Sequence, residues 1–393
     1  MNIVGIIAEY NPFHQGHAFH LEQARRLSKA DYVIVAMSGS YVQRGVPAMF
    51  DKYTRAKAAL LSGADLILEL PLHIATASAE YFACGAVRLL SDTGVVTDLC
   101  FGSECGMLPP LADIAKLLSE EPASYQKALK QALRLGKTYP KARAQALGQC
   151  GFSKIPPDLL DSPNNLLAVE YLKALQKLPS TIRPHTLKRT GVSYHGQQLS
   201  SQTAASATGI RQALLESRGF FTDAIKVQLP FSEIYEPYEG RTPMTEDAFS
   251  LLLLERLRRD PSEHFASCFD VPEALSNRIR SCLEDFRSFS QFTDLVKTRN
   301  FTRTAVSRAL LHILLQIRTC EPANLIRVLG FRKSAEPLLK ELSTKASLPL
   351  VTTPSDRRLP ADWLYADRLY ESVRSLLQDC PFQEESRRKM LVV

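Results

Sequence analysis

The chain is 393 residues long and carries 48 lysine and arginine residues against 41 aspartate and glutamate residues, a formal net charge of +7. Its hydrophobic content of 45% and charged content of 23% are ordinary for globular proteins, which excludes a disordered chain, a collagen and a coiled-coil rod. No uncharged apolar run approaches the ~18 residues that span a bilayer, so we expect no membrane partner. The length predicts two to three domains.

Strands and helices alternate in the first hundred residues. Short apolar runs bounded by turn residues predict buried strands at residues 3–8, 32–37, 66–71 and 98–102. Helical spacing of apolar residues predicts helices between them, at 18–28, 52–61 and 81–90. This alternation predicts an α/β fold with a doubly wound parallel sheet, which binds ligands outside the carboxyl ends of its strands. The polar and glycine-containing turns after the first, second and fourth strands all fall at that edge.

The rest of the chain is predicted to be mainly helical. Stretches rich in alanine, leucine and lysine predict helices at 111–118, 123–135 and 166–177. Beyond about residue 213 the pattern stays helical, with proline and glycine as interruptions. Proline, glycine and tyrosine cluster at 215–245, so we expect two parts, 1–215 and 216–393, of which the second is mostly α-helical.

The excess positive charge is concentrated in one segment. Residues 287–345 hold eleven basic and four acidic residues, so this segment carries the whole net charge of +7. A local basic excess is typical of a site for a polyanion. The charge count alone fits a solvated helix face equally well.

A polar turn at residues 11–17, Asn-Pro-Phe-His-Gln-Gly-His, joins the first predicted strand to the first predicted helix. The free N–H groups and the dipole of a helix N-terminus bind anions. Gly16 leaves room for a flat group such as adenine, and His14 and His17 can donate hydrogen bonds to phosphate oxygens as charge builds at an α-phosphorus. Two histidines in a turn are often incidental, but the strand–turn–helix context favours a nucleotide site.

His14, Gly16 and His17 resemble the HxGH motif of the superfamily of nucleotidyltransferases and class I aminoacyl-tRNA synthetases. More specifically, residues 9–17 resemble the opening of the bacterial tRNA(Met) cytidine acetate ligases. The similarity continues, in order, through residues 38–45 (SGSYVQRG), 101–104 (FGSE), 162–167 (SPNNLL), 187–189 (LKR), 302–304 (TRT) and 327–331 (RVLGF). The HxGH motif alone identifies only the superfamily, whereas the ordered set covers most of the chain and is much more specific.

The resemblance implies a nucleotidyltransferase-like (HUP, Rossmann-like) ATP-binding and adenylation domain at 1–215 and a helical, basic tRNA-binding region at 216–393. It implies a ligase that works in two steps. Acetate attacks the α-phosphate of ATP, giving acetyl-adenylate and pyrophosphate. The wobble cytidine of elongator tRNA(Met) then takes the acetyl group, giving N4-acetylcytidine and AMP. We expect Mg²⁺ to accompany the ATP phosphates and expect no separate metal site.

The resemblance also implies which residues form the site. His14 and His17 are the expected catalytic residues. The expected ATP contacts at the end of the first strand and the start of the first helix are Ile7, Ala8, Glu9, Tyr10, Asn11, Pro12, Phe13, His14, Gln15, Gly16, His17 and His20. Further ATP contacts map to Gly102, Asn164, Asn165 and Arg189.

Two more groups are candidates for holding phosphates. Residues 206–211 (SATGIR) resemble the ISSTxIR motif of the same superfamily, so Ser206, Thr208 and Arg211 are expected to bind the triphosphate. The first serine of the usual motif is Ala205 here, so this position supplies no hydroxyl group. The chain lacks a KMSKS-type loop, and the pair Lys188 and Arg189 is the candidate substitute. Without the resemblance, these groups would be interpreted as an N-cap and surface charge.

The basic segment contains the candidate RNA contacts, which are Lys297, Arg299, Arg303 and Arg308. On a helix, the three arginines would form a basic stripe opposite the apolar residues of 310–315. Such phosphate contacts give affinity without sequence choice, while a single-stranded anticodon loop exposes bases for direct reading.

Lys52 and Arg55 lie three residues apart on a predicted helix that follows the second strand. They would share one face and fit acetate, phosphate or RNA, but a solvated face is equally consistent with them. Glu69 and Glu80 are candidate structural partners for these bases.

Two other classes of function use some of the same features. A small-molecule nucleotidyltransferase, which transfers AMP or CMP to a phosphorylated precursor, would share the HxGH and SxTxIR motifs but leaves a helical extension of about 180 residues unexplained. An RNA-binding protein with a degenerate nucleotide fold would not need its HxGH motif intact. The eight cysteines without a CxxC pair, and an N-terminus without a basic signal region, predict a cytoplasmic protein without a zinc site.

Overall fold

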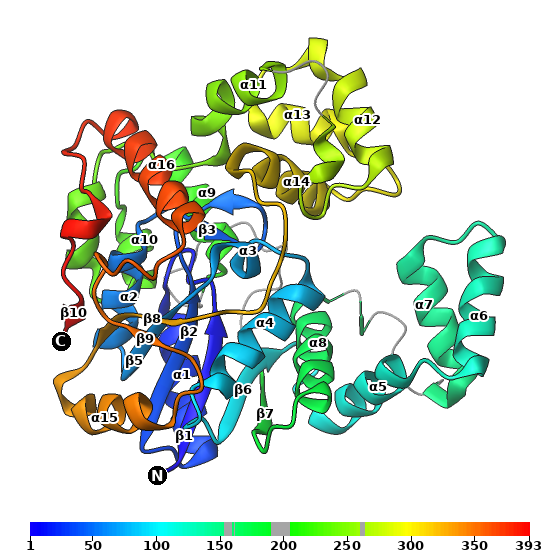
Figure 1. Cartoon of the computed structure of the whole chain (residues 1–393), viewed down its shortest axis with the longest axis horizontal. Helices are drawn as coiled ribbons and strands as arrows, with labels where there is room; N and C mark the ends of the chain where they lie inside the picture. Colours follow the sequence, from blue (N-terminus) through cyan, green and yellow to red (C-terminus); the bar gives the residue numbers. More distant parts are fainter. Residues whose placement is uncertain (153–158, 161, 190–204, 260–263) are drawn as a thin grey trace.

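A single large sheet forms the centre of the computed structural model (Figure 1), which describes residues 1–393 except 153–158, 161, 190–204 and 260–263. The strand order is β10-β8-β5-β2-β1-β6-β7, and β9 pairs with β8. The strands are β1 Ile3–Ala8, β2 Tyr32–Ser38, β5 Leu66–Leu70, β6 Asp98–Ser103, β7 Arg183–Lys188, β8 Ile326–Phe331, β9 Leu350–Val351 and β10 Leu391–Val392. A separate short hairpin consists of β3 Tyr41–Val42 and β4 Val46–Pro47.

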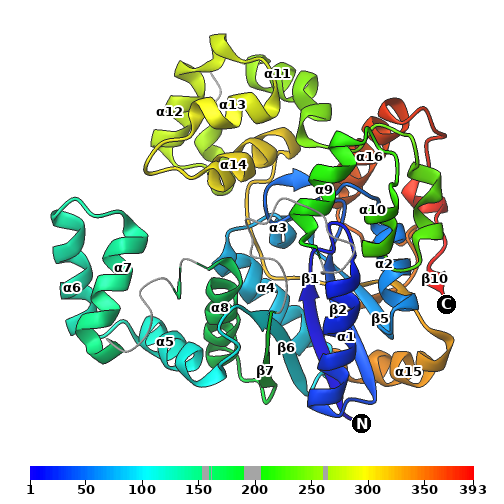
Figure 2. The same cartoon turned by 180° about the vertical axis from the view of Figure 1, so that it is seen from behind.

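Helices cover both faces of this sheet (Figures 1 and 2). Alternate strand residues contribute to two different cores, because successive side chains of a strand point to opposite faces. The helices of one face are α1 Gln15–Ser28, α2 Lys52–Leu61, α9 Ala207–Glu216 and α10 Asp223–Gln228. The helices of the other face are α3 Leu72–Ala75, α4 Ala79–Asp92, α5 Leu108–Glu120, α8 Pro163–Lys177 and α15 Glu336–Lys345. The predicted doubly wound α/β sheet is confirmed.

The four predicted strands are β1, β2, β5 and β6, and they are parallel. The chain moves outward from β1 to β2 and β5, then returns to β6 on the other side of β1 and continues to β7. The direction of winding therefore reverses between β1 and β6. Since sheets of this kind bind ligands at that point, the carboxyl ends of β1 and β6 are the expected place for the site.

Strands that the sequence did not predict complete the sheet. β7 contains Pro184 and polar residues, which an edge strand tolerates. β8 is buried along its whole length and lies antiparallel to β5. The region 216–393 is mostly helical, as expected, but it also supplies β8, β9 and β10. A boundary at residue 215 therefore does not separate the sheet from the helices.

Two helical lobes extend from the sheet. The first consists of α11 Ser250–Arg258, α12 Glu273–Ser281, α13 Phe289–Val296 and α14 Arg303–Leu315, and it shares a core with α16 Ala361–Leu377. The second is the hairpin of α6 Ala123–Arg134 and α7 Tyr139–Leu147. Gly45, between β3 and β4, fixes the first lobe: its φ is 74°, and a Cβ there would lie 2.4 Å from the backbone nitrogen of Arg308. Only glycine allows α14 to approach the loop after β2 this closely.

Candidate active site

His14 and His17 are held rigidly at the start of α1. His14 is the N-cap, and its Nδ1 accepts a hydrogen bond of 3.0 Å from the backbone N–H of Gly16. The Nδ1 of His17 accepts a bond of 3.2 Å from the backbone N–H of His14. The two rings lie with centroids 3.8 Å apart. This reciprocal cap satisfies two N–H groups that a helix start otherwise leaves free.

The cap also determines the tautomer of both rings. Because each Nδ1 accepts a backbone hydrogen bond, the neutral ring carries its proton on Nε2. Burial, with Arg189 and Arg211 nearby, lowers the pKa of His14 to about 3. Burial, followed by the influence of His14 and Arg189, also holds the pKa of His17 well below its usual value. At neutral pH, the two side chains are therefore neutral donors through Nε2–H.

A buried histidine with a lowered pKa makes the folded protein less stable in acid, and His312, outside the site, is an example. Burial lowers the pKa of His312, on α14, to about 4. Between pH 6.5 and about 4 the unfolded chain binds a proton there that the folded chain does not, so the free energy of unfolding falls as the pH falls. The slope is about 1.4 kcal/mol per pH unit for this residue. Urea denaturation at pH 7, 6 and 5 should show a shallower slope in His312→Gln than in the exposed control His264→Gln, and equal slopes would contradict this account.

Two guanidinium groups reach the histidines from different parts of the chain. Arg189 follows β7, and its side chain packs over Gly102 of β6, where a Cβ would lie 3.2 Å from its Cγ. Arg211 on α9 donates to the carbonyl oxygen of Asn11 at 2.6 Å and to Thr208 Oγ1 at 3.1 Å. The predicted residues Gly102, Arg189 and Arg211 therefore meet the HxGH turn at the carboxyl ends of β1 and β6.

The α9 start and the outer part of α1 complete this group. Ser206 caps α9 by accepting from the backbone N–H of Gly209 at 3.1 Å, and Thr208 is exposed. Lys188 is exposed at the end of β7. Gln15 donates to the carbonyl oxygen of Val227 at 3.3 Å. The buried Nε2 of His20 has no hydrogen-bond partner among the described residues, which makes it a candidate ligand contact.

Within the predicted turn, only some residues are open to a ligand. Ile7, Ala8 and Glu9 are partly exposed, whereas the next four are buried and shape the turn from below: Tyr10, Asn11, Pro12 and Phe13. A Cβ at Gly16 would lie 2.9 Å from Cε1 of His14. The sequence suggested that this glycine leaves space for adenine, but its first role here is to admit the His14 ring over the helix start.

Asn164 and Asn165 begin α8 and are held by Glu104, which follows β6. The carboxylate of Glu104 accepts from the backbone N–H of Asn164 at 3.2 Å and of Asn165 at 2.7 Å. The side-chain amide of Asn165 also bonds Cys105 and Leu159. Both asparagines therefore lie beside the segment that follows β6, with their side-chain amides already bonded to protein. Sequence reasoning missed Glu104 as an anchor, although it quoted the FGSE stretch that contains it.

Lys52 and Arg55 are buried and bonded to protein, so they do not form a solvated face. Arg55 donates to the carbonyl oxygens of Glu9 at 2.7 Å, Ser38 at 3.0 Å and Phe50 at 3.0 Å. Arg55 therefore connects the turns after β1 and β2 through hydrogen bonds. Sequence reasoning missed this role, because a surface arginine and a buried one have the same helical spacing.

The buried bases find only one of their two expected acidic partners. Lys52 contacts Glu69 at 3.0 Å, as the sequence suggested. Glu80 instead pairs with Lys173 at 3.4 Å. Glu69 therefore belongs to the interior of the protein and Glu80 to its surface.

The predicted basic stripe does not form. Lys297 and Arg299 are exposed in the loop before α14, and Arg303 is half-exposed but paired with Asp294 at 3.1 Å. Arg308 is only 8% exposed and pairs with Asp270 at 2.9 Å. The prediction that Arg308 contacts RNA is wrong, because the helix turns it toward the interior of the lobe.

The charge excess of residues 287–345 is also divided in space. Arg327 is buried in β8. The lysines of α15 lie at the opposite end of the molecule from α14 (Figure 1). This segment therefore does not form a single basic surface.

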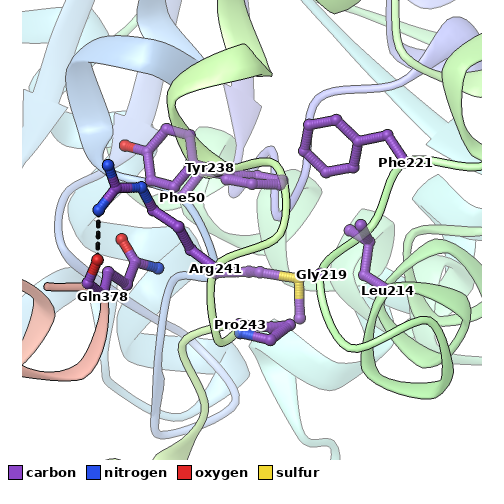
Figure 3. A pocket seen from close by; sticks show the side chains of 9 residues that line it. Phe50, Leu214, Gly219, Phe221, Tyr238, Arg241, Pro243 and Gln378 are labelled. Carbon is purple, nitrogen blue, oxygen red and sulfur yellow. Dashed lines mark hydrogen bonds between the residues drawn. The ribbon is translucent and has the colours of Figure 1, made fainter.

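A small cavity lies beside the segment that precedes α2 (Figure 3). Its walls include Phe50, Leu214, Phe221 and Tyr238, and Arg241 closes it by donating to the carbonyl oxygen of Gln378. Its volume of about 10 Å³ suffices for one water at most, so it is not the nucleotide site. Within the described parts of the chain, no helix is both long and apolar enough to cross a bilayer, and no three His, Cys, Asp or Glu side chains gather as metal ligands.

The sequence matches a known family over nearly its whole length. Residues 1–388 match the family model described as HIGH Nucleotidyl Transferase. The chain is 39% identical to the tRNA(Met) cytidine acetate ligase of Acetivibrio thermocellus, with 91% of this chain and 89% of that protein covered. It is 35% identical to the enzyme of the same name from Halothermothrix orenii, with 100% and 99% covered. The chain belongs to the tRNA(Met) cytidine acetate ligase family of HIGH nucleotidyltransferases.

Solved structures confirm the fold of this family member. The apo crystal structure of Thermotoga maritima TmcAL has a TM-score of 0.90 and 33% identity, and both chains are covered completely. The structure of the same protein bound with alpha-thio ATP has a TM-score of 0.85 and 32% identity, again over 100% of both chains. The family expected from the ordered motifs is thereby confirmed, as is the α/β architecture.

Proposed function

We propose that the protein acetylates N4 of the wobble cytidine of elongator tRNA(Met), using acetate and ATP and releasing AMP and pyrophosphate. The observation that carries this proposal is the pair of neutral histidine donors, with the guanidinium groups of Arg189 and Arg211 nearby, at the switch point of the sheet. The names of the relatives and the nucleotide bound by the Thermotoga maritima protein support it.

In the first step, ATP places its phosphates at the start of α1. The Nε2–H groups of His14 and His17 donate to phosphate oxygens, and Arg189 and Arg211 neutralise the charge that these neutral rings leave uncompensated. An acetate oxygen attacks the α-phosphorus, the bond to the β-phosphate oxygen breaks, and acetyl-adenylate and pyrophosphate form. Mg²⁺ carried by the ATP phosphates would supply further neutralisation there.

In the second step, the N4 amine of the cytidine attacks the acetyl carbonyl carbon. The bond to the AMP oxygen breaks, N4 loses one proton, and N4-acetylcytidine and AMP form. The protein's part is to hold the reacting groups together, which converts a bimolecular reaction into a local one. We propose Lys297, Arg299 and Arg303 as contacts for the tRNA backbone, since the loop before α14 and the start of α14 lie in the lobe above the carboxyl edge of the sheet.

Incubation with ATP, ¹³C-labelled acetate and unmodified tRNA(Met) should produce one labelled N4-acetylcytidine, detected by mass spectrometry of the nucleosides. A transcript with uridine at the wobble position is the matched control and should stay unlabelled. A tRNA without label after incubation with active, ATP-binding protein would contradict the proposal. A nucleotidylated small molecule, formed equally well without tRNA, would favour the alternative of a small-molecule nucleotidyltransferase.

A further inference from the structure

The helical hairpin α6–α7 is unusually basic. Residues 123–147 contain six basic residues and no acidic one. The basic residues are Lys127, Lys130, Arg134, Lys137, Lys141 and Arg143. When net charge is summed over a long segment, acidic residues outside the hairpin cancel its positive charge. The hairpin is therefore not visible in the net charge of the chain.

Half of these charges form a face on α6. Lys127, Lys130 and Arg134 follow the spacing i, i+3, i+7, so they lie on one side of the helix, and all three are exposed. Together with Gln126 and Gln131 they line an open hollow of the surface. Among the described residues, no carboxylate lies within ion-pair distance of the three. A solvated helix face normally mixes both signs of charge, whereas this face has only one.

The connection that contains the hairpin starts and ends beside the proposed ATP site. The chain leaves the carboxyl end of β6, just beyond Gly102, forms α5, α6 and α7, and returns to Asn164 at the start of α8. The tip of the hairpin also contacts the other lobe, since Nη2 of Arg299 donates to the carbonyl oxygen of Gly136 at 2.7 Å. Figures 1 and 2 show the hairpin and the α11–α14 lobe on adjacent sides of the carboxyl edge.

We propose that the face of Lys127, Lys130 and Arg134 is a second contact surface for the phosphate backbone of the tRNA substrate. Lys297 and Arg299 in the loop before α14, with Arg303 at the start of α14, then bind the RNA on one side of the active site, and α6 binds it on the other. The chemistry fits RNA, because lysine and arginine bind phosphates and the two glutamines can bond 2′-hydroxyl groups. This inference rests on the proposed function, which supplies the RNA substrate.

The test compares two triple variants with equal loss of charge. Lys127→Ala/Lys130→Ala/Arg134→Ala removes the proposed surface, and Lys333→Ala/Lys340→Ala/Lys345→Ala removes three exposed lysines at or beside α15, away from the site. We expect the first variant to bind tRNA(Met) at least tenfold more weakly. The slope of log Kd against the logarithm of the salt concentration should be smaller by about two to three in this variant, because two to three phosphate contacts are lost. The α15 variant should bind within twofold of the wild type.

Acetate-dependent exchange of pyrophosphate into ATP, measured without tRNA, shows whether each variant is folded and can form the adenylate. It should stay within twofold of the wild type in both variants. Equal tRNA affinity and equal salt dependence in the α6 variant and the wild type would overturn this inference alone. A wild-type protein that neither exchanges pyrophosphate nor acetylates tRNA would instead overturn the proposed function. Restoration of binding by Lys127→Arg/Lys130→Arg/Arg134→Lys would assign the effect to charge.

Discussion

Replacing His14 with asparagine should reduce acetate-dependent pyrophosphate exchange by about 10²–10³-fold while leaving the fold intact. Removal of one well-placed donor to developing charge typically has an effect of this size. The Oδ1 of asparagine takes the place of Nδ1 and still accepts from the backbone N–H of Gly16, and asparagine is among the best N-cap residues. What the substitution removes is the Nε2–H group, the proposed donor to the α-phosphate.

Comparison of His14→Ala with His14→Asn separates the two roles of His14, as a helix cap and as a phosphate donor. His14→Ala removes both the cap and the donor, so it should lose the same activity and in addition about 0.5–2 kcal/mol of stability. The exposed His264→Asn is the matched control and should be neutral in both measurements. An asparagine variant that exchanges pyrophosphate within threefold of the wild type would show that Nε2–H does not act on the phosphate. Thermal unfolding, measured beside the exchange assay, checks that the asparagine variant stays folded.

The pattern of the first hundred residues predicted the sheet well because the determinants of its strands and turns are local. Each strand there is a short apolar run, and each turn follows a strand, so the sheet edge with His14 and His17 could be located from order alone. The helix start was placed late, at residue 18, although α1 begins at Gln15. Gly16 reads as a turn residue in sequence, but the first turn of a helix has free N–H groups and accepts it readily.

Tertiary burial decided what the sequence could not predict. Lys52, Arg55 and Arg308 have the spacing of a solvated face, yet each is buried and bonded to protein. The partners of Lys52, for example, are Glu69, Asp367 and Glu385, which lie 17, 315 and 333 residues away in the chain. A local sequence pattern contains no information about partners so distant. β8 was missed for a related reason, since its apolar run follows a helical region and pairs with β5 from the first part of the chain.

Net charge summed along the sequence was the least reliable predictor of where a basic surface forms. The segment 287–345 holds the excess of +7 but distributes it over α14, buried β8 and α15. The hairpin of α6 and α7 has a denser charge that the totals concealed. A window of the length of one helical hairpin would have found it, because a hairpin is the unit that presents one surface.

A buried ion cluster ties the C-terminal residues to the sheet. Arg327 on β8 stands directly opposite Glu69 on β5, with Nη1 and Oε2 3.0 Å apart. Lys52 contacts Glu69 at 3.0 Å, Asp367 of α16 at 2.5 Å and Glu385 at 3.0 Å. Arg327 also contacts both of these last two carboxylates. The cluster therefore holds three carboxylates with two cations in the interior, and burial raises the pKa of Glu69.

Arg327→Met should lower the free energy of unfolding by about 3–5 kcal/mol, because it leaves three buried carboxylates with Lys52 as their remaining cation in the cluster. Arg368→Met on α16 is the matched control, since its side chain is 61% exposed beside Glu384, and such a pair contributes about 0–1 kcal/mol. Urea denaturation at pH 7 measures both. A loss below 1 kcal/mol in Arg327→Met would show that the carboxylates take up protons at little cost.

The double variant Arg327→Met/Glu69→Gln should be less destabilised than the two single losses combined, because the partner left unpaired is then neutral. Recovery of this kind would identify electrostatic imbalance, rather than lost packing, as the cause.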